Sequence, residues 1–153
     1  MKVKTSANYN ASRHSIGDGG DLSDNKITVL VVNEDRSVVR SFERVLERNG
    51  YEVDTARTGK EAMEKIKNRS YDVMLIDSRL PDMDGADLLI MTKYSLPDAV
   101  KMVITGLSSE DTVSHATEQG ADSHLVKPVS PDELLLLIKE KLLRRIQRKA
   151  TAP

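Results

Sequence analysis

Polar side chains follow four short stretches of this sequence, at the point where each stretch ends. They are Asn33-Glu34-Asp35 after residues 27–32, Asp77 after residues 72–76, Thr105 after residues 100–104 and Lys127 after residues 122–126. Paired carboxylates suit Mg²⁺, which prefers oxygen ligands and leaves room for phosphate oxygens. A hydroxyl and an ammonium group suit the charge of a phosphoryl group. An ionised carboxylate can itself act as the nucleophile and form an aspartyl phosphate.

The stretches before these residues have the composition of strands. Residues 27–32, 72–76 and 100–104 are mostly apolar on both faces, which is typical of strands that helices cover on both sides. Residues 51–55 and 122–126 are shorter and more polar, and they suit edge strands.

Helical patterns lie between these strands. The first carries Val38, Phe42 and Leu46 on one face and stops at Asn49-Gly50, a typical C-cap signal. The second is centred on residues 62–66, and the third runs from about Asp84 to before Pro97. The fourth runs from after Ser109 to Gly120, and the fifth opens with Ser130-Pro131-Asp132-Glu133. Five alternations of strand and helix predict a parallel sheet with helices on both faces. The polar residues should then converge at the carboxyl edge of that sheet.

Composition narrows the function further. The chain of 153 residues has a net charge of −1, 3% aromatic residues and no cysteine. A thiolate site and a disulfide scaffold are therefore excluded, and binding to nucleic acid is not expected, because it normally requires a basic face. No apolar run approaches the length of a membrane span, and the N-terminus has no secretory pattern. A cytoplasmic protein without membrane contact is the expectation.

The ends of the chain differ from its middle. Residues 1–26 are rich in Ser, Asn, Asp and Gly without apolar periodicity, which predicts a disordered tail. Residues 27–143 are expected to form the domain, and residues 144–153 a basic extension of the last helix, where cations favour the helix C-terminus.

The ordered set of motifs resembles the receiver domain of two-component response regulators, the CheY-like superfamily. The motifs are Val29-Leu30-Val31-Val32-Asn33-Glu34-Asp35, Gly50-Tyr51-Glu52-Val53, Asp72-Val73-Met74-Leu75-Ile76-Asp77, Leu80-Pro81-Asp82-Met83-Asp84-Gly85, Ile104-Thr105-Gly106, Gly120-Ala121-Asp122 and Lys127-Pro128. The resemblance covers residues 27–143. It implies a flavodoxin-like (βα)5 sandwich with a five-stranded parallel sheet in the order 2-1-3-4-5.

The same resemblance implies a role for each site residue. Asp77 would accept a phosphoryl group from a phosphohistidine on a sensor histidine kinase or a histidine phosphotransfer protein. Thr105 would bind that group and shift inward, and Lys127 would pair with one of its oxygens. Mg²⁺ would be held by Asp77, by Glu34 and by the backbone carbonyl of Arg79. The bond from Lys127 to Pro128 is expected to be cis.

The first motif departs from the family, which normally opens with two aspartates. An alignment without gaps places Asn33 and Glu34 there, which removes one negative charge from the metal site. A slip of one residue would instead make Glu34 and Asp35 the pair. We favour the alignment without gaps, because slipping a buried strand inverts its faces. Either register predicts a weaker affinity for Mg²⁺ than in a standard receiver, with Asn33 or Asp35 as a further contributor.

Two more positions differ from the usual pattern. His124 stands where the family often carries an aromatic switch residue, and its imidazole could reorient in the same way or simply be half-exposed. Arg79, two residues after the acceptor, would contact an approaching phosphodonor or water, or lie exposed in a loop.

The expected function is that of a stand-alone phosphoacceptor switch, because the residues after Leu143 are too few to fold as an output domain. Phosphorylation would bias the face made by the fourth helix, fifth strand and fifth helix, which an unidentified downstream protein or a second copy would bind. The alternative is a pseudo-receiver that binds partners without phosphorylation. Beyond accepting and slowly losing its own phosphoryl group, the chain is not expected to be an enzyme. A haloacid-dehalogenase-type phosphatase would need an acid at Arg79, and no Gly-x-Gly-x-x-Gly follows the first strand.

Overall fold

The computed structural model describes residues 26–106 and 119–151. Within them, five parallel strands form one sheet in the order β2-β1-β3-β4-β5. The strands are β1 (Thr28–Val32), β2 (Glu52–Ala56), β3 (Val73–Asp77), β4 (Val100–Thr105) and β5 (Ser123–Val126). The predicted sheet and its strand order are confirmed, with the two most polar strands at the edges, where one side is left unpaired.

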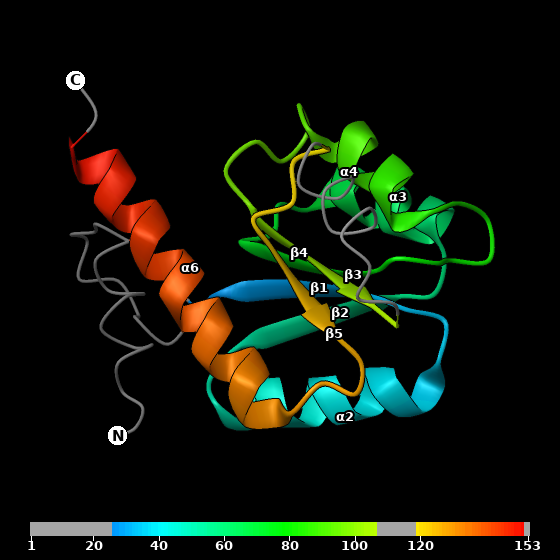
Figure 1. Cartoon of the computed structure of the whole chain (residues 1–153). Coiled ribbons are helices and arrows are strands. Elements are labelled where there is room, and N and C mark those ends of the chain that lie inside the picture. The colour runs from blue at the N-terminus through cyan, green and yellow to red at the C-terminus, as the bar shows by residue number, and fades with distance from the viewer. Residues whose placement is uncertain (1–25, 107–118, 152–153) are drawn as a thin grey trace.

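Four helices are described, namely α2 (Arg36–Arg48), α3 (Gly59–Asn68), α4 (Gly85–Thr92) and α6 (Pro131–Thr151). In Figure 1, α2 and α6 lie on one face of the sheet, and α3 and α4 lie on the other. The predicted fourth helix and the predicted disordered tail fall almost entirely on residues 107–118 and 1–25, which lie outside the described residues. No helix in the described part of the chain is long and apolar enough to cross a membrane.

The sheet divides the core into two layers because successive side chains of a strand point to opposite faces. Val29 and Val31 of β1 pack with Phe42 and Leu46 of α2 and with Leu134 and Ile138 of α6. Leu30 and Val32 pack instead with the helices α3 and α4. The three central strands are therefore apolar on both faces, as their composition predicted.

Local signals set the ends of the helices. Asp35 caps α2, and the helix ends before Gly50, whose φ of +90° is readily adopted only by glycine. At α6, the Glu133 amide donates to the Ser130 hydroxyl at 3.4 Å, and Pro131 is the first helical residue. The helix continues to Thr151, so residues 144–151 are helical.

Candidate functional site

The predicted site residues stand side by side at the carboxyl edge of the sheet. β1 and β3 pair through Val32 and Ile76, which places Asn33 next to Asp77 at the strand ends. Asp77 pairs with Ile104, immediately before Thr105, and Thr105 pairs with Val126, immediately before Lys127. The strand order thus brings four residues that are distant in sequence to one place.

Asp77 is buried, with 6% of its surface exposed, and its carboxylate meets a cation. The Lys127 amine lies 3.3 Å from Oδ1 and 3.4 Å from Oδ2 of Asp77. The backbone amide of Arg79 also donates to Oδ1, at 3.4 Å. The Lys127 side chain is 40% exposed, so the amine can be reached from solvent. The bond from Lys127 to Pro128 is cis, as the resemblance implied.

We expect Lys127→Met to slow phosphoryl transfer to Asp77 by about 100-fold, because a positioned cation stabilises charge that develops in the transition state. The initial rate of phosphorylation by acetyl phosphate, followed by intact mass, measures this effect. Lys67→Met removes an exposed lysine from α3 and serves as the matched control. Equal rates for the two variants would show that the Lys127 amine has no part in the transfer.

Thr105 and Asn33 flank the acceptor, and both are buried, with 3% and 1% of their surfaces exposed. The Lys127 backbone amide donates to the Thr105 carbonyl at 2.8 Å. This bond holds the end of β5, which precedes the Lys127 amine, against the end of β4, which carries the Thr105 hydroxyl. The Ser78 amide donates to the Ile104 carbonyl at 2.8 Å in the same way. These backbone bonds hold the acid, the alcohol and the amine at one edge.

The three residues after β1 have different surroundings. Asn33 follows the strand directly and is buried, whereas Glu34 is exposed. The Asp35 carboxylate accepts hydrogen bonds from the amides of Ser37 and Val38, at 2.9 and 3.4 Å, and so caps α2. Both hydrogen bonds fall on Oδ1, so the capping role fixes one oxygen of this carboxylate at the start of α2.

The chemistry of the donor set expected from the sequence fits a magnesium ion. The set would consist of the carboxylates of Asp77 and Glu34 and the backbone carbonyl of Arg79, all of them oxygen ligands. Magnesium in phosphoryl-transfer sites is commonly held by one or two carboxylates, and water and phosphate complete its coordination. Among the described residues, no group of three or more His, Cys, Asp or Glu side chains is arranged to hold a metal.

The remaining predicted residues lie at the rim of the site. His124 is exposed on β5, the strand that pairs with the one that carries Thr105, and its role as a switch residue stays a prediction. Arg79 is exposed in the loop after β3 and forms an isolated antiparallel bridge with Asp84. Its backbone amide, and not its guanidinium group, contacts the acceptor.

Asp82 has a structural role that its place in the motif from Leu80 to Gly85 did not indicate. The Asp82 carboxylate accepts hydrogen bonds from the amides of Gly59 and Lys60, both at 2.9 Å, and so caps α3 from the loop that follows the acceptor. The side chain of Met83 occupies the space beside Gly59. The loop after Asp77 is therefore held to the start of another helix by a long-range contact that has no sequence signal.

We expect Asp82→Asn to lower the free energy of unfolding at neutral pH and to have less effect in acid. The amides of Gly59 and Lys60 hold the pKa of Asp82 below its ordinary value. A lowered pKa in the folded state stabilises the protein above the unfolded pKa, about 4, and this contribution is lost as the pH falls through the folded pKa. Thermal unfolding of both proteins between pH 2 and 7 measures the effect. A difference that does not change with pH would contradict this assignment.

Gly85 closes the same motif and is the first residue of α4. A Cβ atom at this position would lie 2.5 Å from the backbone oxygen of Asp77 and 3.1 Å from the Cα of Ser78. The Gly85 amide donates to the Ser78 carbonyl at 2.8 Å. The first turn of α4 is therefore packed directly against the backbone of the acceptor, which requires a residue without a side chain.

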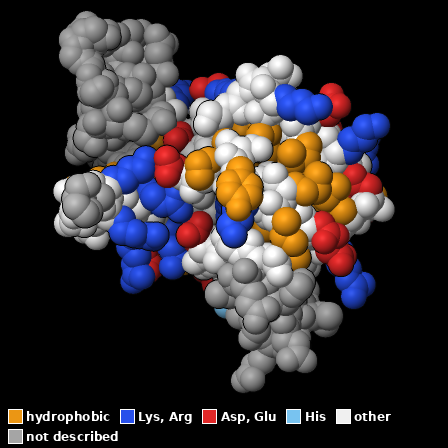
Figure 2. Space-filling view, turned by 90° about the horizontal axis from the view of Figure 1, so that it is seen from above, with side chains coloured by type: hydrophobic (Ala, Val, Ile, Leu, Met, Phe, Trp, Pro, Cys, Tyr) orange, Lys and Arg blue, Asp and Glu red, His pale blue; other side chains and the backbone are white. Residues whose placement is uncertain are grey.

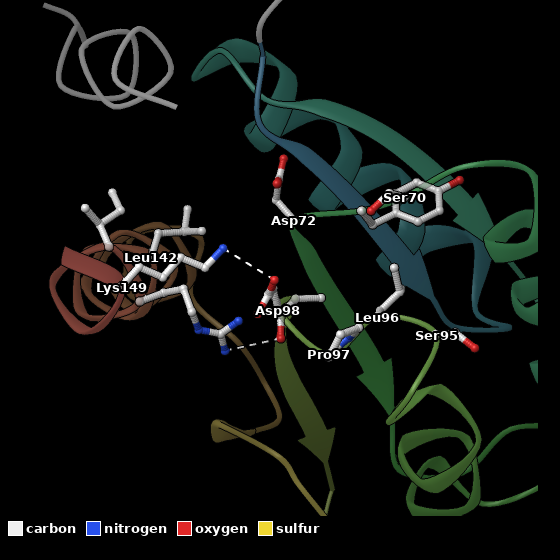
Figure 3. A pocket seen from close by; sticks show the side chains of 12 residues that line it. Ser70, Asp72, Ser95, Leu96, Pro97, Asp98, Leu142 and Lys149 are labelled. Atoms are coloured by element: carbon white, nitrogen blue, oxygen red, sulfur yellow. Dashed lines mark hydrogen bonds and ion pairs between the residues drawn. The ribbon is translucent and has the colours of Figure 1, made fainter. Parts of the chain in front are cut away.

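A pocket of about 490 Å³ lies at the opposite, amino-terminal edge of the sheet (Figure 3). Residues before β3, residues 95–99 and the last turns of α6 line it. Lys149 pairs with Asp98 at 3.4 Å, and Arg145 donates to the Ala99 carbonyl and to Asp122, both at 3.3 Å. None of the predicted site residues lines this pocket. The ion pairs around it join α6 to Asp98 and Asp122, which precede β4 and β5.

Exposed hydrophobic side chains gather on two parts of the surface. Figure 2, which views the molecule from the side of α3 and α4, shows such side chains between charged ones. On and after α4, Ile90 is 50%, Met91 45% and Tyr94 87% exposed, while Leu136 and Leu143 are exposed on α6. Of the partner face expected from the sequence, β5 and α6 are described, and α6 presents apolar residues to solvent.

Comparison with known proteins identifies the family. Residues 29–139 match the response regulator receiver domain. The chain is 34% identical to the transcriptional regulatory protein ZraR of Klebsiella oxytoca, over 79% of this chain and 27% of that protein. It is also 34% identical to the response regulator MprA of Mycobacterium sp. strain KMS, over 78% of this chain and 51% of that protein.

Solved structures of receiver domains and response regulators resemble this chain as well. A CheY-like receiver domain protein from Methanospirillum hungatei JF-1 matches with a TM-score of 0.77 and 36% identity, over 80% of this chain and 98% of that one. The beryllofluoride-activated NtrC4 receiver domain dimer matches with a TM-score of 0.73 and 40% identity, over 77% and 98% of the two chains. A Burkholderia pseudomallei response regulator with a phosphorylated aspartic acid and a calcium ion matches with a TM-score of 0.71 and 26% identity, over 82% and 74%.

This chain belongs to the receiver domain family of two-component response regulators. Receiver domains are in general signalling modules and not enzymes, and they interact with histidine kinases or phosphotransfer proteins and with downstream effectors. The chain spans about a quarter to a half of the length of the curated relatives named above.

Proposed function

We propose that Asp77 accepts a phosphoryl group from a phosphohistidine of a partner kinase or phosphotransfer protein. A carboxylate oxygen of Asp77 would attack phosphorus, the bond from phosphorus to the imidazole nitrogen would break, and its electron pair would leave with the imidazole. An acyl phosphate on Asp77 would result. The observation that supports this most strongly is the buried carboxylate at the end of β3 with the Lys127 amine 3.3 Å away.

The neighbouring residues have distinct proposed roles. Lys127 would balance the negative charge of an incoming phosphoryl oxygen, and the Arg79 amide, which donates to Oδ1 of Asp77, would donate to a second oxygen. The Thr105 hydroxyl would hydrogen-bond the phosphoryl group once it is attached. All of these groups favour the transfer by position and charge, which is the main form of catalysis in phosphoryl transfer.

Magnesium would be held by Asp77, Glu34 and the backbone carbonyl of Arg79. When bound, the ion would supply positive charge to neutralise the phosphoryl oxygens. The capping role of Asp35 supports the register in which Glu34 is the second carboxylate. Since Asn33 is neutral, we still propose a weaker affinity for magnesium than in a receiver with two aspartates.

The response would be a change of the face that includes β5 and α6. An inward shift of Thr105 would leave space for His124 to reorient, and a downstream partner or a second copy would bind the altered face. The domain would comprise residues 27–143 in a cytoplasmic protein. The curated relatives are longer than this chain. The receiver domain itself would accept the phosphoryl group, change its binding face and slowly lose the phosphoryl group again.

Loading with a small phosphodonor tests this function. The protein is incubated with acetyl phosphate, or with beryllofluoride as a phosphoryl analogue, in buffer with and without magnesium. We expect the mass of one phosphoryl group to be added, and a fluoride complex to be visible by ¹⁹F NMR, both strongly favoured by magnesium. Transfer from a panel of phosphorylated histidine kinases then identifies the donor.

The contrary result would favour a pseudo-receiver. The specific observation behind this second candidate is Asn33, a neutral residue at a position where the family usually has an acid. If neither acetyl phosphate nor beryllofluoride binds at saturating magnesium, while the protein remains folded by circular dichroism, the chain would act through binding alone.

A further inference from the structure

The Asn33 side chain lies at the edge of the site, and its oxygen atom already accepts a hydrogen bond. It is buried, with 1% of its surface exposed, and its backbone amide donates to the Ala56 carbonyl at 3.0 Å. Its Oδ1 atom accepts a hydrogen bond from the Asp35 amide at 2.9 Å. Because Oδ1 faces a donor, the orientation of the side-chain amide is determined, and the other atom must be the NH2 group.

That NH2 group is buried and has no hydrogen-bond partner among the described residues. Buried donors in native proteins are almost always paired, and each exception calls for an explanation. An NH2 group can only donate, so it cannot bind a metal ion through this atom. Its natural complement is an oxygen that accepts hydrogen bonds, particularly one that carries negative charge.

The position of Asn33 indicates which oxygen this is. Val32 of β1 pairs with Ile76 of β3, so the next residues, Asn33 and Asp77, lie beside each other at the same edge of the sheet. Paired strands lie about 4.8 Å apart. The Asp77 carboxylate is already contacted by the Lys127 amine and the Arg79 amide. A group attached to Asp77 would therefore bring new acceptor oxygens into the neighbourhood of Asn33.

We propose that the Asn33 NH2 group donates a hydrogen bond to a phosphoryl oxygen on Asp77. This inference rests on the proposed function and adds a binding residue to it. A second aspartate at this position would repel the phosphoryl group and rely on the metal to offset that repulsion. The neutral donor attracts the phosphoryl group directly, so that loading depends less on magnesium than it would with an aspartate.

The test compares beryllofluoride binding by the wild type, Asn33→Ala and Asn33→Asp across a magnesium series, with ¹⁹F NMR to count the bound fraction. Asn33→Asp keeps an acceptor for the Asp35 amide but loses the donor, and Asn33→Ala loses both the donor and that acceptor without adding charge. Asn68→Ala removes a side-chain amide on the exposed surface of α3 and is the matched control. Circular dichroism confirms that each variant is folded.

We expect Asn33→Ala to weaken beryllofluoride binding about tenfold at saturating magnesium, the usual effect of losing one hydrogen bond to a charged acceptor. Asn33→Asp should bind magnesium more tightly than the wild type and yet bind beryllofluoride more weakly once magnesium is saturating. In the wild type, the NMR resonances of the Asn33 side-chain NH2 group, assigned by their absence from the Asn33→Asp spectrum, should shift when beryllofluoride is added.

Two outcomes separate the two proposals. If the wild type loads but Asn33→Ala loads equally well, and the NH2 resonances do not move, the hydrogen bond from Asn33 is overturned and the function of Asp77 stands. If the wild type fails to bind beryllofluoride at saturating magnesium, the acceptor function itself fails, and the role of Asn33 fails with it.

Discussion

Replacing Asp77 by asparagine is expected to abolish phosphoryl incorporation. The substitution keeps the size of the side chain but replaces an anionic nucleophile by a neutral amide, which cannot form an acyl phosphate. It also removes one carboxylate from the proposed magnesium ligands. Because the change removes a buried charge, the folded protein should persist, and the loss should be one of chemistry.

The measurement is intact mass after incubation with acetyl phosphate and magnesium, followed by transfer from the phosphorylated cognate kinase. Asp98→Asn is the matched control, since Asp98 is exposed and belongs to an ion pair with Lys149 at the other edge of the sheet. Incorporation should fall below detection in Asp77→Asn alone. Equal incorporation in both variants would place the acceptor elsewhere, for example at Glu34 or Asp35.

Gly85→Ala is expected to damage both the stability of the domain and the loading of Asp77. The added Cβ atom would lie 2.5 Å from the backbone oxygen of Asp77, a distance that real Cβ atoms essentially never show. Backbone atoms cannot give way as a flexible side chain can, so α4 must move away from the end of β3. Overpacking of this kind typically lowers the free energy of unfolding by about 1–3 kcal/mol.

Chemical denaturation measures the stability of this variant, and beryllofluoride binding measures its site. Gly106→Ala is the matched control, because a Cβ atom at Gly106 would meet no atom of residues 26–106 and 119–151 within 4 Å. Gly85→Ala should be clearly less stable than Gly106→Ala and should bind beryllofluoride more weakly than the wild type. Equal stability of the two variants would contradict the close approach of α4 to Asp77.

The sequence allowed much of the architecture to be predicted, for identifiable physical reasons. Residues 73–76 are uniformly apolar, and β3 indeed lies at the centre of the sheet with helices on both faces. The placement of Asp77 and Lys127 at one edge followed from the parallel arrangement, because parallel strands end at the same edge, whereas the strand order was implied by the resemblance to receiver domains. Residue types and chain order were sufficient for these features.

The contacts that tune the site could not be predicted in this way. The bonds from the amides of Gly59 and Lys60 to Asp82 join residues that are more than 20 positions apart, and no local pattern specifies such a partner. The unpaired NH2 group of Asn33 depends on the orientation of a side-chain amide, which is set by the Asp35 amide. Such contacts between side chains and distant backbone amides depend on the three-dimensional positions of the atoms, which the residue pattern does not specify.

The attachment of α6 has a mechanical consequence. The helix starts beside the reactive edge at Pro131 and is fastened near its far end by Arg145 to the Ala99 carbonyl and to Asp122. Between these ends, Leu134, Ile138 and Leu142 pack in the core on one face of the sheet, and Lys149 pairs with Asp98 one turn after Arg145. A displacement imposed at Pro131 would therefore move the helix as a stiff unit against the sheet, with the contacts of Arg145 and Lys149 resisting it at the other end.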